Sequence, residues 1–227
     1  MHQLRFGAAV TKQHLIFYGC LVVAVILHEI SHGIVAYAYG DDTAKRAGRL
    51  TLNPIPHIDP LGSIILPAMA VLANLPVLGW AKPVPVNPSR LRNPRRQMLW
   101  VGLAGPLTNF SLMVAAAIPA KILLSGTYPG ACISTEFVDP RVSLTGNILA
   151  SFAVVNLLLG LFNLLPIPPL DGASLIERVL PARYLQTYWK IRPYGFLILF
   201  LGLFYLHLFG RILDPFLGDL CRYLIRP

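Results

Sequence analysis

Two histidines and a glutamate interrupt an apolar stretch near the start of the chain. His28, Glu29 and His32 stand near the middle of the run VAVILHEISHGIVAYAYG at residues 23–40. On a helix, side chains four positions apart share one face, about 5–6 Å between Cβ atoms, so two imidazoles can bind one Zn²⁺. Glu29 is then placed to accept a proton from a metal-bound water. Ionisable side chains in a membrane span are usually functional, which favours this interpretation over a buried polar cluster or proton relay.

A catalytic zinc site usually takes a third protein ligand and leaves its fourth position to water. Asp171 stands out because it lies in NLLPIPPLDG at residues 163–172, where prolines end an apolar helix and Asp-Gly forms a turn. An irregular chain at membrane depth is tolerated only where it is buried in protein or lines a wet cavity. Asp171 can also be the N-cap of a helix at 172–182, and the two roles can coexist. The other candidates by side-chain type are His57, Asp59, Asp139, His207, Asp214 and the three cysteines.

The composition is that of an integral membrane protein. Of 227 residues, 55% are hydrophobic and only 13% are charged, whereas soluble domains carry about 25% charged residues. Lys and Arg outnumber Asp and Glu by 19 to 10, but no basic helix or aromatic-interleaved basic patch suggests a nucleic-acid partner. We therefore expect one membrane-embedded domain over residues 1–227, with no soluble peptidase domain.

Apolar segments near the roughly 20 residues needed to cross a bilayer predict an all-α polytopic membrane protein. A shorter apolar segment at 61–80 contains two prolines and either spans or re-enters the membrane. A signal peptide at 13–40 is disfavoured because His-Glu-x-x-His would interrupt its apolar region. Short edge strands are expected at 48–54 and 82–88, with plain connecting loop as the alternative. The four long segments are about 14–39, 97–124, 147–165 and 193–213.

Basic residues in the connecting segments predict the topology. Connectors 40–60, 81–96 and 166–192 are rich in Lys and Arg, whereas 125–146 contains only Arg141. The positive-inside rule places the three basic connectors in the cytoplasm and 125–146 outside. The 61–80 segment then has cytoplasmic flanks and is expected to re-enter; if it spans, the N-terminus lies inside instead. We expect a multi-pass protein of the cell membrane whose active site faces the cytoplasm.

Three motifs together resemble the site-2 protease family of intramembrane zinc metalloproteases. HEISHG matches the family's HExxH, NLLPIPPLDG matches N-x-x-P-x-x-x-x-D-G, and GLAGPLTNF at 102–110 is similar to a Gly-Pro-x-x-Asn element on the middle core helix. GRLTLNPIPHIDPLG and GWAKPVPVNP resemble the compact prokaryotic branch without PDZ or CBS domains. The resemblance covers about residues 14–180, and the segment 193–213 is not diagnostic.

The resemblance implies a core of three helices around one zinc ion. The implied zinc ligands are His28, His32 and Asp171, with Glu29 as the general base.

On the substrate side, the resemblance implies that Asn163 holds the substrate backbone or steadies developing charge. We also take Asn109 and His57 as substrate-binding candidates. A lone asparagine in a span is often only a helix–helix hydrogen bond, and His57 can be an ordinary loop residue.

The expected activity is hydrolysis of peptide bonds within transmembrane segments of membrane proteins. A helical substrate must unwind first, and an edge strand at 48–54 or 82–88, or the 61–80 segment, could pair with it by strand addition. Substrates implied by the family are membrane-anchored transcription factors, anti-sigma factors and signal-peptide remnants, among which the sequence does not choose. The alternatives are a zinc carrier that uses the same ligands without needing Glu29, and an inactive scaffold. Membrane lipids are expected partners, and the sequence does not fix the oligomeric state.

Overall fold

Helices and connecting loops make up the computed structural model of the 227-residue chain. It describes residues 12–65, 69, 81–124, 143–195, 197, 199, 201–202 and 208–225, and none of these residues forms a β-strand.

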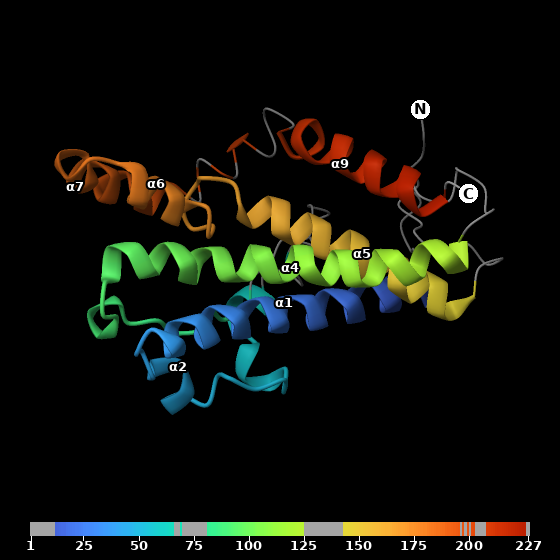
Figure 1. The fold of residues 1–227 in the computed structure, drawn as a ribbon, viewed down its shortest axis with the longest axis horizontal. Helices are drawn as coiled ribbons and strands as arrows, with labels where there is room; N and C mark the ends of the chain where they lie inside the picture. The colour runs from blue at the N-terminus through green and yellow to red at the C-terminus, as the bar shows by residue number, and fades with distance from the viewer. Residues whose placement is uncertain are drawn as a thin grey trace.

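Three long helices lie side by side and form the centre of the molecule (Figure 1). They are α1 (Lys12–Ala38), α4 (Pro94–Leu124) and α5 (Leu144–Asn163). Each is long and apolar enough to cross a membrane. The prediction of an all-α polytopic membrane protein is confirmed, and the three helices correspond to the predicted segments 14–39, 97–124 and 147–165.

Small side chains line the seams between these helices. Ala24 and Ala36 of α1 and Ala153 of α5 are fully buried, and α4 contributes a buried alanine cluster that includes Ala116 and Ala120. Small residues let helix backbones approach closely, which is the usual basis of packing between helices in a membrane. Polar groups on neighbouring helices can therefore reach one another across the seams.

The hydrogen bonds across the seams define the helix directions. His28 of α1 contacts Asn109 of α4, and His32, one turn later in α1, contacts Val101, which is earlier in α4. The two helices are therefore antiparallel. Because α4 and α5 follow one another through 125–142 and also run in opposite directions, α1 and α5 are parallel and end together (Figure 1).

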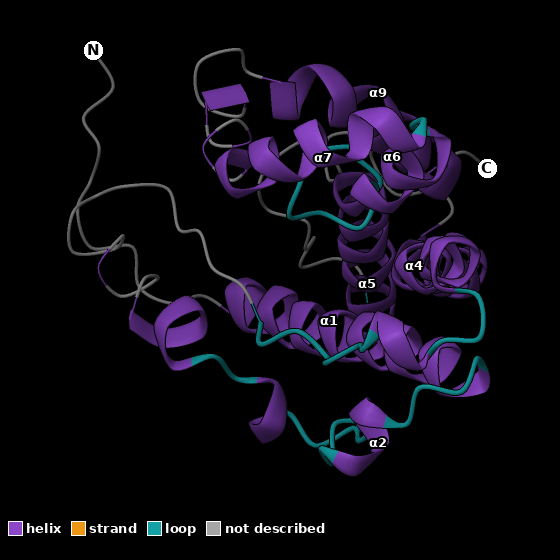
Figure 2. Ribbon diagram, turned by 90° about the vertical axis from the view of Figure 1, so that its left-hand side faces the viewer, coloured by secondary structure: helices purple, strands orange, loops and turns teal. Residues whose placement is uncertain are grey.

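The connectors that follow α1 and α5 lie at this shared end of the bundle. Figure 2 shows α2 on one side of the bundle and α6 and α7 on the other. The C-terminal helix α9 (Leu208–Ile225) packs on α4 and α5 through Leu217, Leu220 and Leu224. The short elements after α1 are α2 (Thr43–Arg46), η1 (Ile55–His57), the π-helical turn η2 (Pro60–Ile65) and η3 (Pro88–Arg90). Those after α5 are α6 (Ala173–Val179), α7 (Ala182–Ile191) and η5 (Arg192–Tyr194).

The expected edge strands at 48–54 and 82–88 are wrong. Residues 48–54 are turns and coil, and residues 82–87 are coil that leads into η3 at Pro88. In the second stretch the prolines have no N–H to donate to a ladder. The N–H groups of Lys82, Val84 and Asn87 donate instead to His57 O, Glu29 Oε2 and Asp41 Oδ2. These bonds hold residues 81–87 against α1 and the loops that follow it, without a strand partner.

Two predicted membrane segments lie partly outside the described residues. Of 61–80, the structure describes only 61–65 and 69, so re-entry stays a prediction. Of 193–213, the structure describes a part, which includes the first residues of α9 (Leu208–Ile225).

Candidate metal centre

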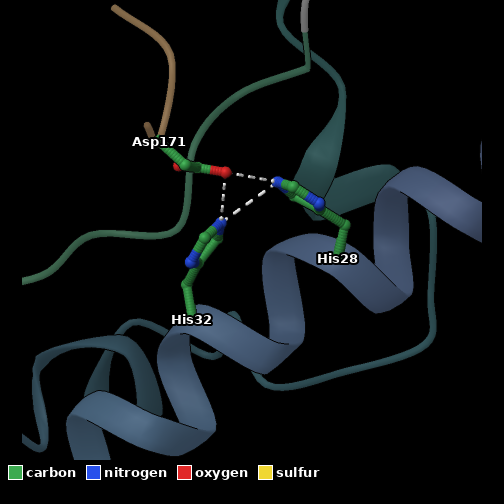
Figure 3. Close-up of side chains that lie close together, drawn as sticks. All are labelled: His28, His32 and Asp171. Carbon is green, nitrogen blue, oxygen red and sulfur yellow. Dashed lines mark hydrogen bonds and ion pairs between the residues drawn. The ribbon is translucent and has the colours of Figure 1, made fainter. Parts of the chain in front are cut away.

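His28, His32 and Asp171 point toward one another from two separate parts of the chain (Figure 3). The two imidazole Nε2 atoms lie 3.1 Å apart. Asp171 Oδ2 is 3.0 Å from the Nε2 atom of His28 and 3.3 Å from that of His32. One ligand atom from each residue lies within 4.8 Å of the others, which is the size of a site for a single metal ion.

The outer nitrogen of each imidazole is fixed by an oxygen acceptor. His28 Nδ1 donates to Asn109 Oδ1 at 2.5 Å, and His32 Nδ1 donates to the Val101 carbonyl at 2.6 Å. An oxygen acceptor at Nδ1 places the ring proton there, so the neutral imidazole presents a lone pair at Nε2. Both lone pairs therefore face Asp171.

A second asparagine orients the first. Asn109 Nδ2 donates to Asn156 Oδ1 at 2.8 Å, and Asn156 Nδ2 donates to the Phe152 carbonyl of its own helix at 2.8 Å. Because a backbone carbonyl can only accept, this chain of bonds fixes which end of each amide is the oxygen. Both asparagines are fully buried. Sequence analysis did not assign Asn156 a role at the site.

Asp171 reaches the imidazoles because the chain turns back at the end of α5. Proline lacks the N–H that a helix needs, so the prolines after Leu164 end α5. The Gly172 N–H then donates to the Asn163 carbonyl at 2.7 Å. A Cβ on Gly172 would come within 2.5 Å of backbone atoms of Leu164 and Leu165, so only glycine allows this close approach. α6 begins directly after it, at Ala173.

Gly105 of α4 leaves room for the two imidazoles. A Cβ at this position would lie 2.5 Å from His32 Nε2 and 2.6 Å from His28 Nε2. Any side chain here would displace the rings from their present positions. Gly105 belongs to the motif GLAGPLTNF, but the sequence did not show that it faces the histidines.

These residues fit a bound zinc ion. Three electron-pair donors converge, two imidazole nitrogens and one carboxylate oxygen, which would repel one another without a cation between them. Asp171 Oδ2 is buried and accepts no hydrogen bond from the described residues. His28 and His32 are also buried, at 6% and 8% exposed. Two histidines and one carboxylate form a donor set of catalytic zinc sites.

Glu29 lies next to this centre in the sequence and contacts the 81–87 segment. Its Oε2 accepts a hydrogen bond from the Val84 N–H at 2.8 Å. Its Oε1 has no hydrogen bond within the described part of the chain. One carboxylate oxygen is thus fixed by a backbone amide, and the other is available to a water or a substrate amine.

Asp41 ties the 81–87 segment to the end of α1. Its Oδ2 accepts from the Asn87 N–H at 2.6 Å, and its Oδ1 accepts from the N–H and the hydroxyl of Thr43. Burial raises the pKa of Asp41, but these hydrogen bonds and the positive charge of Arg90 outweigh burial and lower the pKa below its ordinary value. The ionised carboxylate is therefore the form that holds this junction together.

The substrate-binding candidates lie in three different settings. Asn109 is buried between His28 and Asn156, so its described contacts are those of a positioning residue. The Asn163 side chain donates to the Leu159 carbonyl of its own helix at 3.0 Å. His57 is buried outside the metal cluster and contacts the Thr51 carbonyl through Nε2. Their substrate roles stay predictions.

Among the described residues, no other possible third ligand joins the two histidines. His28, His32 and Asp171 form the only metal-compatible cluster among the residues that the structure describes. Asp59 instead accepts the N–H groups of Leu61 and Gly62 at the start of η2. Asp139 and His207 lie outside the described residues.

Comparison with known proteins decides the family. The model of peptidase family M50 matches residues 140–204. The "Putative zinc metalloprotease YwhC" of Bacillus subtilis is 37% identical over 198 residues, which cover 87% of this chain and 84% of that protein. The chain belongs to peptidase family M50. It is a zinc metalloprotease, and the resemblance to the site-2 protease family is confirmed.

Other M50 relatives are more distant. The "Putative zinc metalloprotease Rip2" of Mycolicibacterium smegmatis is 29% identical over 86% of this chain and 71% of its own length. The "Zinc metalloprotease MJ0392" of Methanocaldococcus jannaschii is 27% identical over 72% of this chain and 34% of its own length. No solved structure matches the chain.

Proposed function

We propose that this M50 protease hydrolyses peptide bonds in the membrane-spanning segments of other membrane proteins. The observation that carries the proposal is the convergence of His28, His32 and Asp171 inside a bundle of helices that can cross a membrane. A soluble substrate would not need a metal centre at that location.

The depth of the centre supports this substrate class. The helix α1 ends at Ala38, ten residues after His28 and six after His32. At a rise of 1.5 Å per residue, the two imidazoles lie about 15 Å and about 9 Å below the end of the helix. The hydrocarbon core is about 30 Å thick. A peptide bond that reaches this centre therefore lies within or at the edge of the bilayer.

The proposed chemistry divides between the metal and Glu29. Bound zinc polarises a peptide carbonyl and lowers the pKa of a water. Asn109 and Val101 keep the His28 and His32 lone pairs pointed at the metal position through their bonds to Nδ1. Glu29 accepts the proton of the attacking water at Oε1 and passes it to the leaving amine. The Val84 N–H holds the other carboxylate oxygen in place during both transfers.

We also propose that the end of the bundle nearest the metal centre faces the cytoplasm across the cell membrane. Basic residues of the connectors before α4 and after α5 gather at this end, which the positive-inside rule places in the cytoplasm. They include Arg90, Arg92, Arg95, Arg178 and Arg183.

The decisive experiment compares metal content with cleavage for Glu29→Gln. The full chain is purified, its zinc is measured, and cleavage of a panel of single-span substrates is followed in lipid nanodiscs. Loss of a general base lowers rates by about 10²–10⁴-fold, whereas His28, His32 and Asp171 are unchanged. We expect full zinc content with cleavage reduced to that extent.

Glu177→Gln is the matched control, because Glu177 is a half-buried acid of α6 that pairs with Arg192 and is not part of the metal-compatible cluster. It should retain both zinc and cleavage. A Glu29→Gln protein that cleaves normally excludes the mechanism. A zinc carrier would show zinc movement that survives Glu29→Gln and no cleavage by the unaltered chain.

A further inference from the structure

The short helix α7 has an aromatic face and a basic face, and the proposed proteolysis uses neither of them. Tyr184, Tyr188 and Ile191 recur at intervals of four and three residues, so they share one face of the helix. Leu185 and Trp189 widen this face by their own four-residue spacing. The side chains of Tyr184, Trp189 and Ile191 are 48%, 54% and 50% exposed. Leu185 and Tyr188 at the middle of this face are partly buried, and the Tyr188 hydroxyl is buried. The flanks of the aromatic face, with Tyr184, Trp189 and Ile191, are thus left uncovered by the described protein.

The opposite face of α7 is basic. Arg183, Thr187 and Lys190 follow one another at intervals of four and three, and all three are exposed. The Arg183 guanidinium lies 4.7 Å from the centre of the Tyr184 ring, at the boundary between the two faces. Helices with Lys or Arg on one face and Trp, Tyr or Leu on the other lie in the interface of a membrane.

The position of α7 in the molecule is consistent with a helix that lies at the interface between membrane and water. The turn between α6 and α7 is fixed to the start of α4, because Arg95 donates to the Leu180 carbonyl at 2.6 Å. α4 is one of the spanning helices and begins at Pro94. α6 and α7 continue beyond the end of α5 in Figure 1. α7 is therefore held where the bundle would leave the hydrocarbon layer.

We propose that α7 binds the surface of the leaflet at this end of the bundle and prefers anionic phospholipids. The exposed aromatic rings enter the boundary between headgroups and acyl chains, where such rings are favoured. Arg183 and Lys190 contact the phosphate groups, because basic side chains next to a membrane are attracted to anionic lipid. Charge complementarity favours this occupant over a neutral protein surface.

The lipid contact lies directly beside the loop that carries Asp171. Trp189 and Arg192 line an open cavity of about 330 Å³ together with Pro168, Pro169 and Pro193. Behind it, Gly195 packs so closely on the Pro168 backbone that a Cβ there would overlap it. Lipid seated on α7 therefore supports the same loop that positions the third donor of the metal centre. The binding itself does not depend on proteolysis.

The test follows Trp189 fluorescence in the full chain. The chain has three tryptophans, so Trp80→Phe with Trp100→Phe leaves Trp189 as the sole reporter. The protein is placed in nanodiscs of phosphatidylcholine alone or mixed with phosphatidylglycerol. Quenching is measured with bromine on the acyl chains and with aqueous iodide. We expect bromine quenching and protection from iodide, both stronger with phosphatidylglycerol and both weakened by salt.

Charge reversal separates anionic recognition from simple insertion. Arg183→Glu with Lys190→Glu should remove the increase in bromine quenching and in iodide protection that phosphatidylglycerol causes. The control reverses the charge of two other basic residues, Arg46 and Arg222, whose side chains are 69% and 77% exposed. This control variant should keep the stronger bromine quenching and iodide protection in phosphatidylglycerol. Iodide access without bromine quenching overturns the proposal. Quenching that is equal in both lipids and insensitive to charge reversal overturns the anionic preference, and protection from both quenchers indicates a protein partner instead.

Discussion

At the level of single residues, oxygen atoms outside the metal centre set its chemistry. The two imidazoles can offer Nε2 only while Nδ1 keeps its proton, and that depends on the Asn109 side chain and the Val101 carbonyl. The backbone carbonyl is present whatever the side chain at 101. The His28 contact instead depends on two buried amides in series, Asn109 and Asn156. Partners of this kind orient metal ligands and raise their basicity.

Asn156→Ala tests this relay without changing any of the three proposed metal ligands. With its partner removed, Asn109 can rotate and present its NH₂ group to His28, which would then lose the correct proton position. We expect the zinc dissociation constant to rise about 10–100-fold, measured by competition with a chelator in detergent.

Asn147→Ala removes another buried amide from the same helix, nine residues earlier, and serves as the control. It should leave zinc affinity unchanged even if it lowers thermal stability. Equal losses of zinc affinity in both variants would show that the effect comes from general loosening of α5 and not from the relay.

At the level of elements, the 81–87 segment connects Glu29, the proposed general base, to the rest of the molecule. It is held at one end by Asp41 and at the other by Arg49, whose guanidinium donates to the Lys82 carbonyl at 2.6 Å. Arg49 is 6% exposed. Between these anchors, the Val84 N–H meets Glu29. The segment thus positions a carboxylate that it does not itself contain.

Val84→Pro removes the N–H that fixes Glu29 and changes side-chain volume little. A hydrogen bond to a charged group contributes about 1.5–3 kcal/mol, so we expect cleavage to slow by about tenfold or more. Zinc content should not change, because His28, His32 and Asp171 keep their contacts. Val86→Pro is the control, since it also follows a proline and the Val86 N–H makes no described hydrogen bond. Similar slowing in both variants would assign the effect to the backbone of the segment.

Asp41 gives the same junction a dependence on pH. Its folded pKa is lowered, so ionised Asp41 stabilises the fold. That stability is fully present above the ordinary pKa of about 3.9 and is lost as the pH falls through the lower folded value. At neutral pH we expect the unaltered chain to have a higher Tm than Asp41→Asn. This difference in Tm should shrink below about pH 4.

Asp219→Asn provides the comparison at an exposed carboxylate, whose side chain is 70% exposed. The Tm of Asp219→Asn should differ little from that of the unaltered chain at every pH, because exposed ion pairs contribute little to stability. If the difference in Tm between Asp41→Asn and the unaltered chain stays the same in acid, ionised Asp41 does not stabilise the fold as proposed.

At the level of the whole molecule, the direction of the three spans determines which compartment supplies water to the metal centre. α1 and α5 end, and α4 begins, at the end of the bundle nearest the two histidines. Single cysteines at Arg46 and Thr145 report on the two ends, because both native residues are exposed.

In sealed cells, a membrane-impermeant maleimide should add a label to Thr145→Cys but not to Arg46→Cys, relative to the parent chain. Inside-out vesicles should show the reverse. The opposite pattern would place the metal centre toward the outside and would refute the proposed cytoplasmic orientation.

Much of the site followed from local sequence. A helix places residues 28 and 32 on one face through its 3.6-residue period, so the histidine pair needed no knowledge of the fold. The prolines before Asp171 marked an irregular turn after a span, and the structure brings that carboxylate to the histidines. The three long helices were equally readable, because the length of an apolar run is a local property.

Only the tertiary structure decided how these parts are supported. The proton position on His28 depends on Asn156, which is 128 residues later, and Gly105 faces the imidazoles only because α4 lies against α1. The 81–87 segment became coil rather than strand because its N–H groups found acceptors on α1 and in nearby loops. Spacing along one chain determines which residues share a face. Contacts between distant segments depend on packing of all three helices at once, and no local pattern encodes them.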